Sequence, residues 1–104
     1  MIDLILLLQA DRDIQSAFQR YENYQAGRGE IFIRQLDFAL TLLRQHPEIA
    51  PVYAGPYRRM LVRDFPYGIF YQRQSTRLII VAIVDLRQNP ETIRKKLFGS
   101  DKPD

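Results

Sequence analysis

The amino-acid sequence predicts an α+β fold with an N-terminal strand, an αα-hairpin, a three-stranded antiparallel meander and a short C-terminal helix. In the first half of the chain, apolar residues recur at the three- and four-residue spacing of amphipathic helices, and from residue 48 onward the pattern is that of extended strands. We expect the helices to pack on one face of a roughly four-stranded sheet, and the short helix or a partner chain to cover the other face. At 104 residues, a single domain spanning residues 1–104 is expected, with a polar tail from about residue 99.

The N-terminal apolar run Leu4–Leu8 predicts a buried strand. No positively charged segment precedes this run and Asp3 interrupts it, so a signal peptide is not expected. The run is also far shorter than the ~18–20 apolar residues that span a bilayer. The sequence therefore predicts a cytoplasmic protein without a membrane partner.

The next two segments predict a helical hairpin. Apolar residues at helical spacing indicate one helix over residues 11–26 and a second over about residues 30–45. Gly27 is expected to end the first helix in the left-handed conformation that glycine adopts without strain. Pro47 limits the second helix, because the residue before a proline disfavours helical geometry.

Three extended segments follow and predict the meander: Tyr57–Val62, Tyr67–Gln72 and Leu78–Asp85. Residues 78–84 contain no polar side chain, which predicts a central strand covered on both faces. Such an apolar strand also predicts a groove that drives self-association when no partner covers it. Asn89 followed by Pro90 predicts the start of the last helix, which extends to about Phe98.

The formal charge of +3 conceals two halves of opposite sign. Residues 1–57 carry five arginines against seven acidic residues, a net charge of −2, whereas residues 58–96 carry nine basic residues against three acidic ones, a net charge of +6. The basic half is expected to form either a solvated surface or a face that meets phosphates or an acidic partner. The absence of cysteine and the single histidine exclude disulfides, thiolate chemistry and multi-histidine metal sites, so no metal or cofactor is expected.

Several motifs together resemble the ParE/RelE toxin superfamily, and most closely the ParE-like plasmid stabilization toxins. They are a helical hairpin broken by Gly-x-Gly, the stretch YRRMLVRDFPYGIFY at residues 57–71, and the sequence DLRQNP at residues 85–90. The resemblance covers roughly residues 3–98. It implies a toxin of a type II toxin–antitoxin pair, neutralised by a small cognate antitoxin, with a dimer or a toxin–antitoxin hetero-oligomer as the expected assembly.

Members of this superfamily act in two ways, and the sequence favours one of them. ParE members inhibit DNA gyrase, whereas RelE members cleave mRNA on the ribosome. Many of the ribonucleases place a histidine or tyrosine just after the last strand, where this chain has Asp85-Leu86-Arg87, and arginine is a poor proton acceptor. The preferred interpretation is therefore a gyrase inhibitor, with a ribosome-dependent endonuclease or a degenerate, non-toxic member as alternatives.

The candidate site residues are basic. A ribonuclease would use Arg59, Arg63, Arg73 and Arg87 for the phosphate and the transition state. Residues expected to contact a partner are Arg58, Arg59, Arg63, Arg87, Arg94, Lys95 and Lys96. Arg58 shares a strand face with Met60, which predicts a pairing with an acid of the helical hairpin such as Glu22 or Asp37.

The aromatic residues and the histidine admit two interpretations each. Tyr21 and Tyr24 on the first predicted helix, with Tyr67 and Tyr71 on a strand, could stack nucleobases or pack in the core. His46 closes the second predicted helix, where a cation meets the last carbonyl groups, and a structural role is expected for it.

Overall fold

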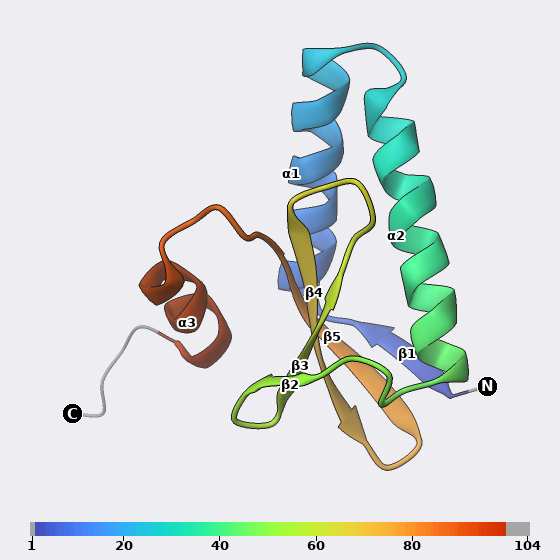
Figure 1. The fold of residues 1–104 in the computed structure, drawn as a ribbon, viewed down its shortest axis with the longest axis vertical. Helices are drawn as coiled ribbons and strands as arrows, with labels where there is room; N and C mark the ends of the chain where they lie inside the picture. Colours follow the sequence, from blue (N-terminus) through green and yellow to red (C-terminus); the bar gives the residue numbers. More distant parts are fainter. Residues whose placement is uncertain (1, 100–104) are drawn as a thin grey trace.

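A computed structural model describes residues 2–99 as a mixed five-stranded sheet with helices on both faces (Figure 1). The elements in chain order are β1 (Asp3–Leu6), α1 (Leu8–Tyr24), α2 (Arg28–Gln45), β2 (Val52–Ala54), β3 (Tyr57–Leu61), β4 (Tyr67–Gln74), β5 (Arg77–Asp85) and α3 (Pro90–Phe98). The strands lie in the order β1-β5-β4-β3-β2. Apart from Gly99, the predicted polar tail lies outside the described residues. None of the helices within residues 2–99 combines the length and the apolar character of a membrane-spanning helix.

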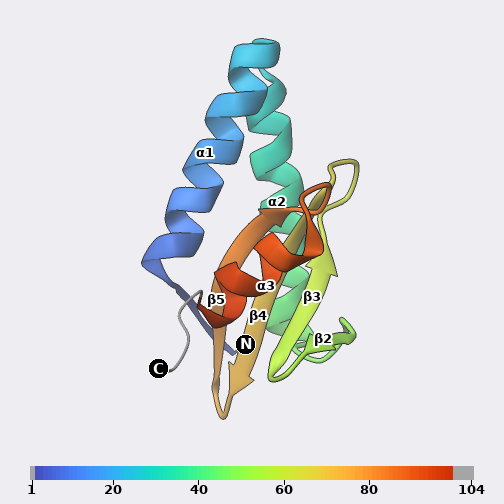
Figure 2. The ribbon, with the colours of Figure 1, turned by 90° about the vertical axis from the view of Figure 1, so that its left-hand side faces the viewer.

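Strand β5 is the centre of the fold. It pairs in parallel with β1 and antiparallel with β4, and only Arg77 on it is exposed. Helices α1 and α2 cover one face of the sheet, and α3 lies across β4 and β5 on the other (Figure 2). The prediction of a central strand covered on both faces is confirmed. The expected open apolar groove is not present on this strand, because α3 fills it with Ile93 and Leu97.

The two faces of the sheet hold separate apolar clusters. On the hairpin side, residues such as Phe32 and Leu43 of α2 pack against Ile69 and Ile83. On the α3 side, Phe70 is fully buried with its neighbours on β5. A bulge between Phe70 and Tyr71 shifts the β4–β5 register by one residue. Phe70 belongs to the cluster on the α3 side, and Tyr71 belongs to the cluster on the hairpin side.

The edges of the sheet differ from the prediction. Residues 52–54 form the additional strand β2, which pairs with β3. This segment lies between Pro51 and Gly55-Pro56, a composition typical of a loop, yet a very short edge strand tolerates such neighbours. At the other edge, β1 ends at Leu6, and helix α1 begins at Leu8, three residues before the predicted start. No side chain caps the start of α1, so no capping signal marked it.

The turn between α1 and α2 is built around a carboxylate. Glu22 accepts hydrogen bonds from the backbone N–H groups of Gly27 (2.8 Å) and Gly29 (3.0 Å). Gly27 adopts the predicted left-handed conformation, with φ at 87°, but α1 ends at Tyr24 and Gly27 caps the start of α2 instead. A Cβ at Gly29 would lie 2.7 Å from a ring carbon of Phe18, so only glycine allows the two helices to approach this closely.

Helix α3 begins as predicted and is tied to the rest of the fold by one lysine. The side chain of Asn89 accepts the N–H of Glu91 at 2.8 Å, with Pro90 in the first turn. Lys96 donates from Nζ to Oδ1 of Asp13 at 2.6 Å. Oδ2 of Asp13 accepts the backbone N–H of Ile83 at 3.0 Å. One carboxylate therefore joins α1, β5 and α3.

Candidate functional site

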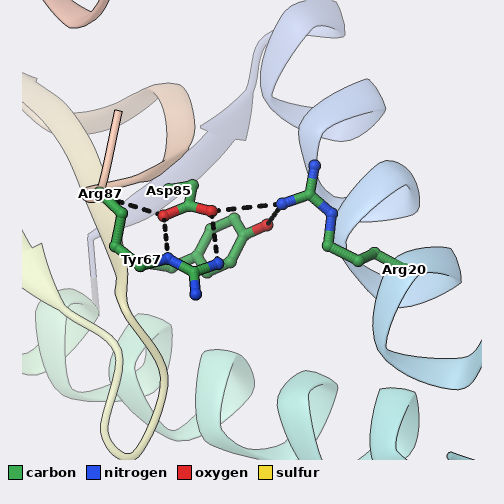
Figure 3. A network of polar contacts seen from close by, with 4 residues as sticks. All are labelled: Arg20, Tyr67, Asp85 and Arg87. Carbon is green, nitrogen blue, oxygen red and sulfur yellow. Dashed lines mark hydrogen bonds and ion pairs between the residues drawn. The ribbon is translucent and has the colours of Figure 1, made fainter. Parts of the chain in front are cut away.

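The candidate site is centred on Asp85, the last residue of β5 (Figure 3). Its carboxylate accepts hydrogen bonds from three donors of Arg87: the backbone N–H (3.0 Å), Nε (3.0 Å) and Nη2 (2.8 Å). From α1, Nη1 of Arg20 donates to the same carboxylate at 3.2 Å and to the hydroxyl of Tyr67 at 3.4 Å. The network joins α1 to the end of the sheet and fixes two guanidinium groups at the molecular surface.

The charged groups of Asp85 and Arg87 in this network stabilise each other's ionised forms. The pKa of Asp85 is lowered by its hydrogen bonds to Arg87, which outweigh the opposing effect of burial, so the carboxylate is ionised at neutral pH. The same hydrogen bonds raise the pKa of Arg87. Burial raises the pKa values of the Tyr21 and Tyr67 hydroxyls, which therefore keep their protons far above neutrality. None of these groups changes its charge near neutral pH.

A shallow pocket of about 370 Å³ opens beside the network, where α1, the start of α2 and the turn between β3 and β4 meet. Three arginines and two tyrosines share its wall with the β3–β4 turn and its neighbours; the lining residues are Arg20, Tyr21, Tyr24, Arg28, Asp64, Phe65, Pro66 and Arg87. The pocket is therefore apolar at its base and cationic at its rim.

An aromatic cluster forms the base of the pocket. The ring of Tyr21 contacts Phe65 edge-on, with centroids 4.9 Å apart, and stacks on Phe32 at 5.6 Å. The guanidinium carbon of Arg28 lies 5.3 Å from the centroid of the Phe65 ring, a cation–π contact that orients this side chain. Tyr24 differs from its neighbours because 79% of its surface is exposed.

The structure does not gather the four arginines that a ribonuclease was expected to use. Arg59 lies opposite Phe70, on the α3 side of the sheet, over the ring of Tyr53. Arg73 lies opposite Leu78, on the hairpin side, and pairs with Glu48 at 3.1 Å. Arg87 lies beyond the opposite end of β4 from Arg73, and Arg63 is exposed in the β3–β4 turn. Only Arg87 lines the pocket.

The residues expected to contact a partner fall into two groups. Arg58 and Lys96 serve the fold. Arg58 donates to the carbonyl oxygens of Ala50 (2.6 Å) and Glu48 (3.4 Å). The predicted pairing of Arg58 with Glu22 or Asp37 is wrong, because its strand position faces the loop after α2. Arg59 is half-buried over the ring of Tyr53 and belongs with the structural group. The remaining residues, Arg63, Arg87, Arg94 and Lys95, are exposed.

Sequence reasoning missed Arg20 and Arg28, which belong to the helical hairpin. Arg20 and Asp85 are 65 positions apart, and no spacing rule connects them. Of the four tyrosines considered for stacking, Tyr67 and Tyr71 are buried, whereas Tyr21 and Tyr24 line the pocket. His46 caps the C-terminal end of α2, and the pocket contacts the other end of that helix.

Comparison with solved structures establishes the class of fold. A chain in a structure described as "Chromosomal ParDE TA system from P. aeruginosa" matches with a TM-score of 0.74 and 13% sequence identity, over 83% of this chain and 97% of that chain. The fold is thus that of a small α+β domain found in a toxin–antitoxin system.

The sequence itself identifies the family. A family model described as "ParE toxin of type II toxin-antitoxin system, parDE" matches residues 4–90, and the chain belongs to this ParE toxin family. The matched region includes the whole pocket, while α3 after Pro90 lies beyond it. A search of curated proteins found no matching sequence.

Proposed function

We propose that this chain is a cytoplasmic toxin that acts by binding DNA gyrase, that it does not cleave RNA, and that a cognate antitoxin neutralises it. The membership of the ParE family supports the toxin role. The similar solved structure is described as a ParDE system, which supports a protein antitoxin as the partner. Both gyrase and the ribosome reside in the cytoplasm, so either target requires the toxin there.

The chemistry of the pocket favours binding over RNA cleavage. Cleavage at a 2′-hydroxyl needs a group that accepts a proton and another that returns one. Asp85 is held as an ionised carboxylate by two arginines, and the pKa values of Tyr21 and Tyr67 are raised by burial. The one carboxylate left in the pocket wall, Asp64, lies in the exposed β3–β4 turn. The scarcity of proton-transfer groups is the observation that carries this proposal.

The exposed basic residues are the proposed contacts with the target. Arg63, Arg94 and Lys95 make no hydrogen bond or ion pair among the described residues, and Arg87 keeps 66% of its side chain exposed although it pairs with Asp85. Unpaired surface cations attract an acidic partner and speed its association. These four residues therefore replace the longer set, which also included Arg58, Arg59 and Lys96.

Two assays with the purified protein test the proposal. The first measures supercoiling of a relaxed plasmid by gyrase with increasing amounts of toxin. The second measures cleavage of a translated mRNA on ribosomes. We expect supercoiling to be lost while the mRNA stays intact, and we expect co-purified antitoxin to restore supercoiling. Cuts in the mRNA with normal supercoiling would replace this proposal with the endonuclease, and silence in both assays would favour a degenerate member.

Three variants sharpen these assays. Arg63→Glu should weaken inhibition of gyrase, whereas Arg34→Glu, the same change at an exposed position of α2, should act as the wild type. Asp64→Asn removes the remaining carboxylate of the pocket and should leave inhibition intact. If mRNA cleavage is seen and Asp64→Asn abolishes it, Asp64 acts in proton transfer and the proposal fails.

A further inference from the structure

We propose that the pocket between α1, α2 and the β3–β4 turn binds a single-stranded nucleic acid, with a phosphate on its arginines and a base against Tyr24. This goes beyond the proposed inhibition of gyrase, which is a contact with a protein. Three features of the pocket support this proposal: the unused donors of its arginines, the net charge of its wall, and the exposed tyrosine at its rim.

The first feature, a set of unused donors, is clearest at Arg28. Its guanidinium is held over the Phe65 ring, yet within residues 2–99 its side chain makes no hydrogen bond and no ion pair. An arginine carries five N–H donors in a planar fork that matches the oxygens of a phosphate. The contact with Phe65 orients this fork in advance, which lowers the entropic cost of engaging an anion.

Arg20 and Arg87 extend the cationic rim. Each is anchored to Asp85, but 60% of the Arg20 side chain and 66% of the Arg87 side chain remain exposed. Arg20 uses only Nη1 in these contacts, and Arg87 uses Nε and Nη2. With Asp64 and Asp85 counted against the three arginines, the site retains a net positive charge.

Tyr24 distinguishes a nucleic acid from an acidic peptide. Tyr24 is 79% exposed and lines the pocket with Arg28. A carboxylate side chain does not stack on an exposed aromatic ring. A nucleobase does, and every base has a π-face for this contact. An acidic peptide would also bring further carboxylates close to Asp64 and Asp85. The combination of ring and guanidinium therefore favours a nucleotide unit.

The test measures binding by the intact protein without gyrase. Fluorescence anisotropy follows a labelled oligothymidylate and, separately, an oligouridylate of the same length, about ten nucleotides, the scale of known single-stranded sites. Tyr24→Ala should weaken binding by about fivefold or more. Arg28→Ala should weaken binding and reduce the magnitude of the negative slope of log K against log salt by about 0.7. Arg28→Lys should bind with intermediate strength, because it keeps the charge and loses the fork.

Arg34→Ala is the matched control, because it removes the same charge from an exposed position of α2 that does not line the pocket. It should change affinity by less than about twofold. If Arg34→Ala and Arg28→Ala weaken binding equally, the binding is diffuse and the proposal is overturned. The absence of binding to either strand would overturn it as well.

Two further outcomes identify the ligand. Binding to both strands, or to one, supports the phosphate-and-base site and identifies its source as DNA, RNA or either. An oligoglutamate peptide that displaces the strand as effectively as unlabelled oligonucleotide would show a carboxylate site and overturn the proposal. Because gyrase is absent from these mixtures, failure here leaves the supercoiling result standing, and the reverse holds equally.

Discussion

Lys96 and Asp13 lie 83 positions apart in the chain and form an ion pair of 2.6 Å between α3 and α1. The two side chains are only 28% and 12% exposed. The other oxygen of Asp13 accepts the N–H of Ile83, a residue of β5 beyond the end of its pairing with β1. Gln9 donates to the carbonyl of Val81 at 3.3 Å in the same region. Side chains of α1 thus take over the hydrogen bonding that a longer β1 would provide.

Removing the lysine should loosen α3. Lys96→Met keeps the apolar stem and deletes the charge, and we expect the free energy of unfolding to fall by about 1–2 kcal/mol. Urea unfolding followed by circular dichroism measures this change. In Lys95→Met, a change at an exposed neighbouring position, the free energy of unfolding should fall by less than about 0.5 kcal/mol. Equal losses in the two variants would contradict a structural role for the Lys96–Asp13 pair.

The two oxygens of Asp13 can be separated by substitution. Asp13→Asn keeps an acceptor for the Ile83 N–H and loses the charge, whereas Asp13→Ala loses both. We therefore expect Asp13→Ala to be less stable than Asp13→Asn by about 1 kcal/mol, the cost of leaving a buried donor unpaired. Identical unfolding curves would show that the N–H of Ile83 finds another partner.

Asp85 should make the free energy of unfolding depend on pH in the acid range. Its pKa in the folded protein lies below the ordinary value of 3.8, so the ionised carboxylate stabilises the fold above that value. This stabilisation is lost as the pH falls from that ordinary value through the lowered pKa. Asp85→Asn should lower the free energy of unfolding by about 2 kcal/mol at neutral pH and flatten the acid dependence. An unchanged acid dependence in Asp85→Asn would assign it to other carboxylates.

Gly29 should tolerate no side chain. In Gly29→Ala the new methyl group would lie 2.7–2.8 Å from the ring and the carbonyl oxygen of Phe18, and overpacking of this kind costs about 1–3 kcal/mol. Thermal unfolding measures the loss. Gly27→Asn is the control, since no atom lies within 4 Å of a Cβ at Gly27 and asparagine accepts its positive φ. A larger loss at Gly27 than at Gly29 would contradict the close packing of α1 and α2.

The hydroxyl of Tyr71 should contribute to the loop after α2. It donates to the carbonyl of Pro47 at 2.9 Å from a fully buried ring. Tyr71→Phe removes this donor, and we expect a loss of about 1 kcal/mol in urea unfolding. Tyr57→Phe provides a comparison, because the hydroxyl of Tyr57 makes no hydrogen bond among the described residues. Equal stability of the two variants would mean that the loop is held by other contacts, such as those of Arg58.

The parts of the fold that local chemistry dictates were predictable from sequence. The apolar run of residues 78–84 permits only a buried strand, and Asn89-Pro90 permits little besides a helix start. The sequence does not predict strand β2, because its neighbours Pro51 and Gly55-Pro56 are residues typical of turns and loops. The segment becomes a strand only through its pairing with β3, which is a tertiary contact. The start of α1 at Leu8 was missed because no capping side chain marks it.

The candidate site was less predictable because its geometry is assembled from distant parts of the chain. Arg87 was selected from its position after the last strand, and Tyr21 and Tyr24 from their aromatic character. Arg20 and Arg28 were not selected, since a single arginine on an amphipathic helix is typical of any solvated face. Arg58 was assigned to an acid of the hairpin, whereas backbone carbonyls of a loop satisfy it. Hydrogen bonds to the backbone leave no mark in the pattern of side chains.

The pairing of β1 with β5 has a consequence for the synthesis of this protein. Leu4 aligns with Leu78 and Leu6 with Ile80, so β1 cannot pair until the ribosome has added the segment that forms β5. Until β5 emerges from the exit tunnel, the nascent chain has a helical hairpin and strands β1 to β4, but it lacks the strand that joins β1 to β4. A product terminated before β5 would lack the strand that links β1 to β4, so it could not complete the sheet.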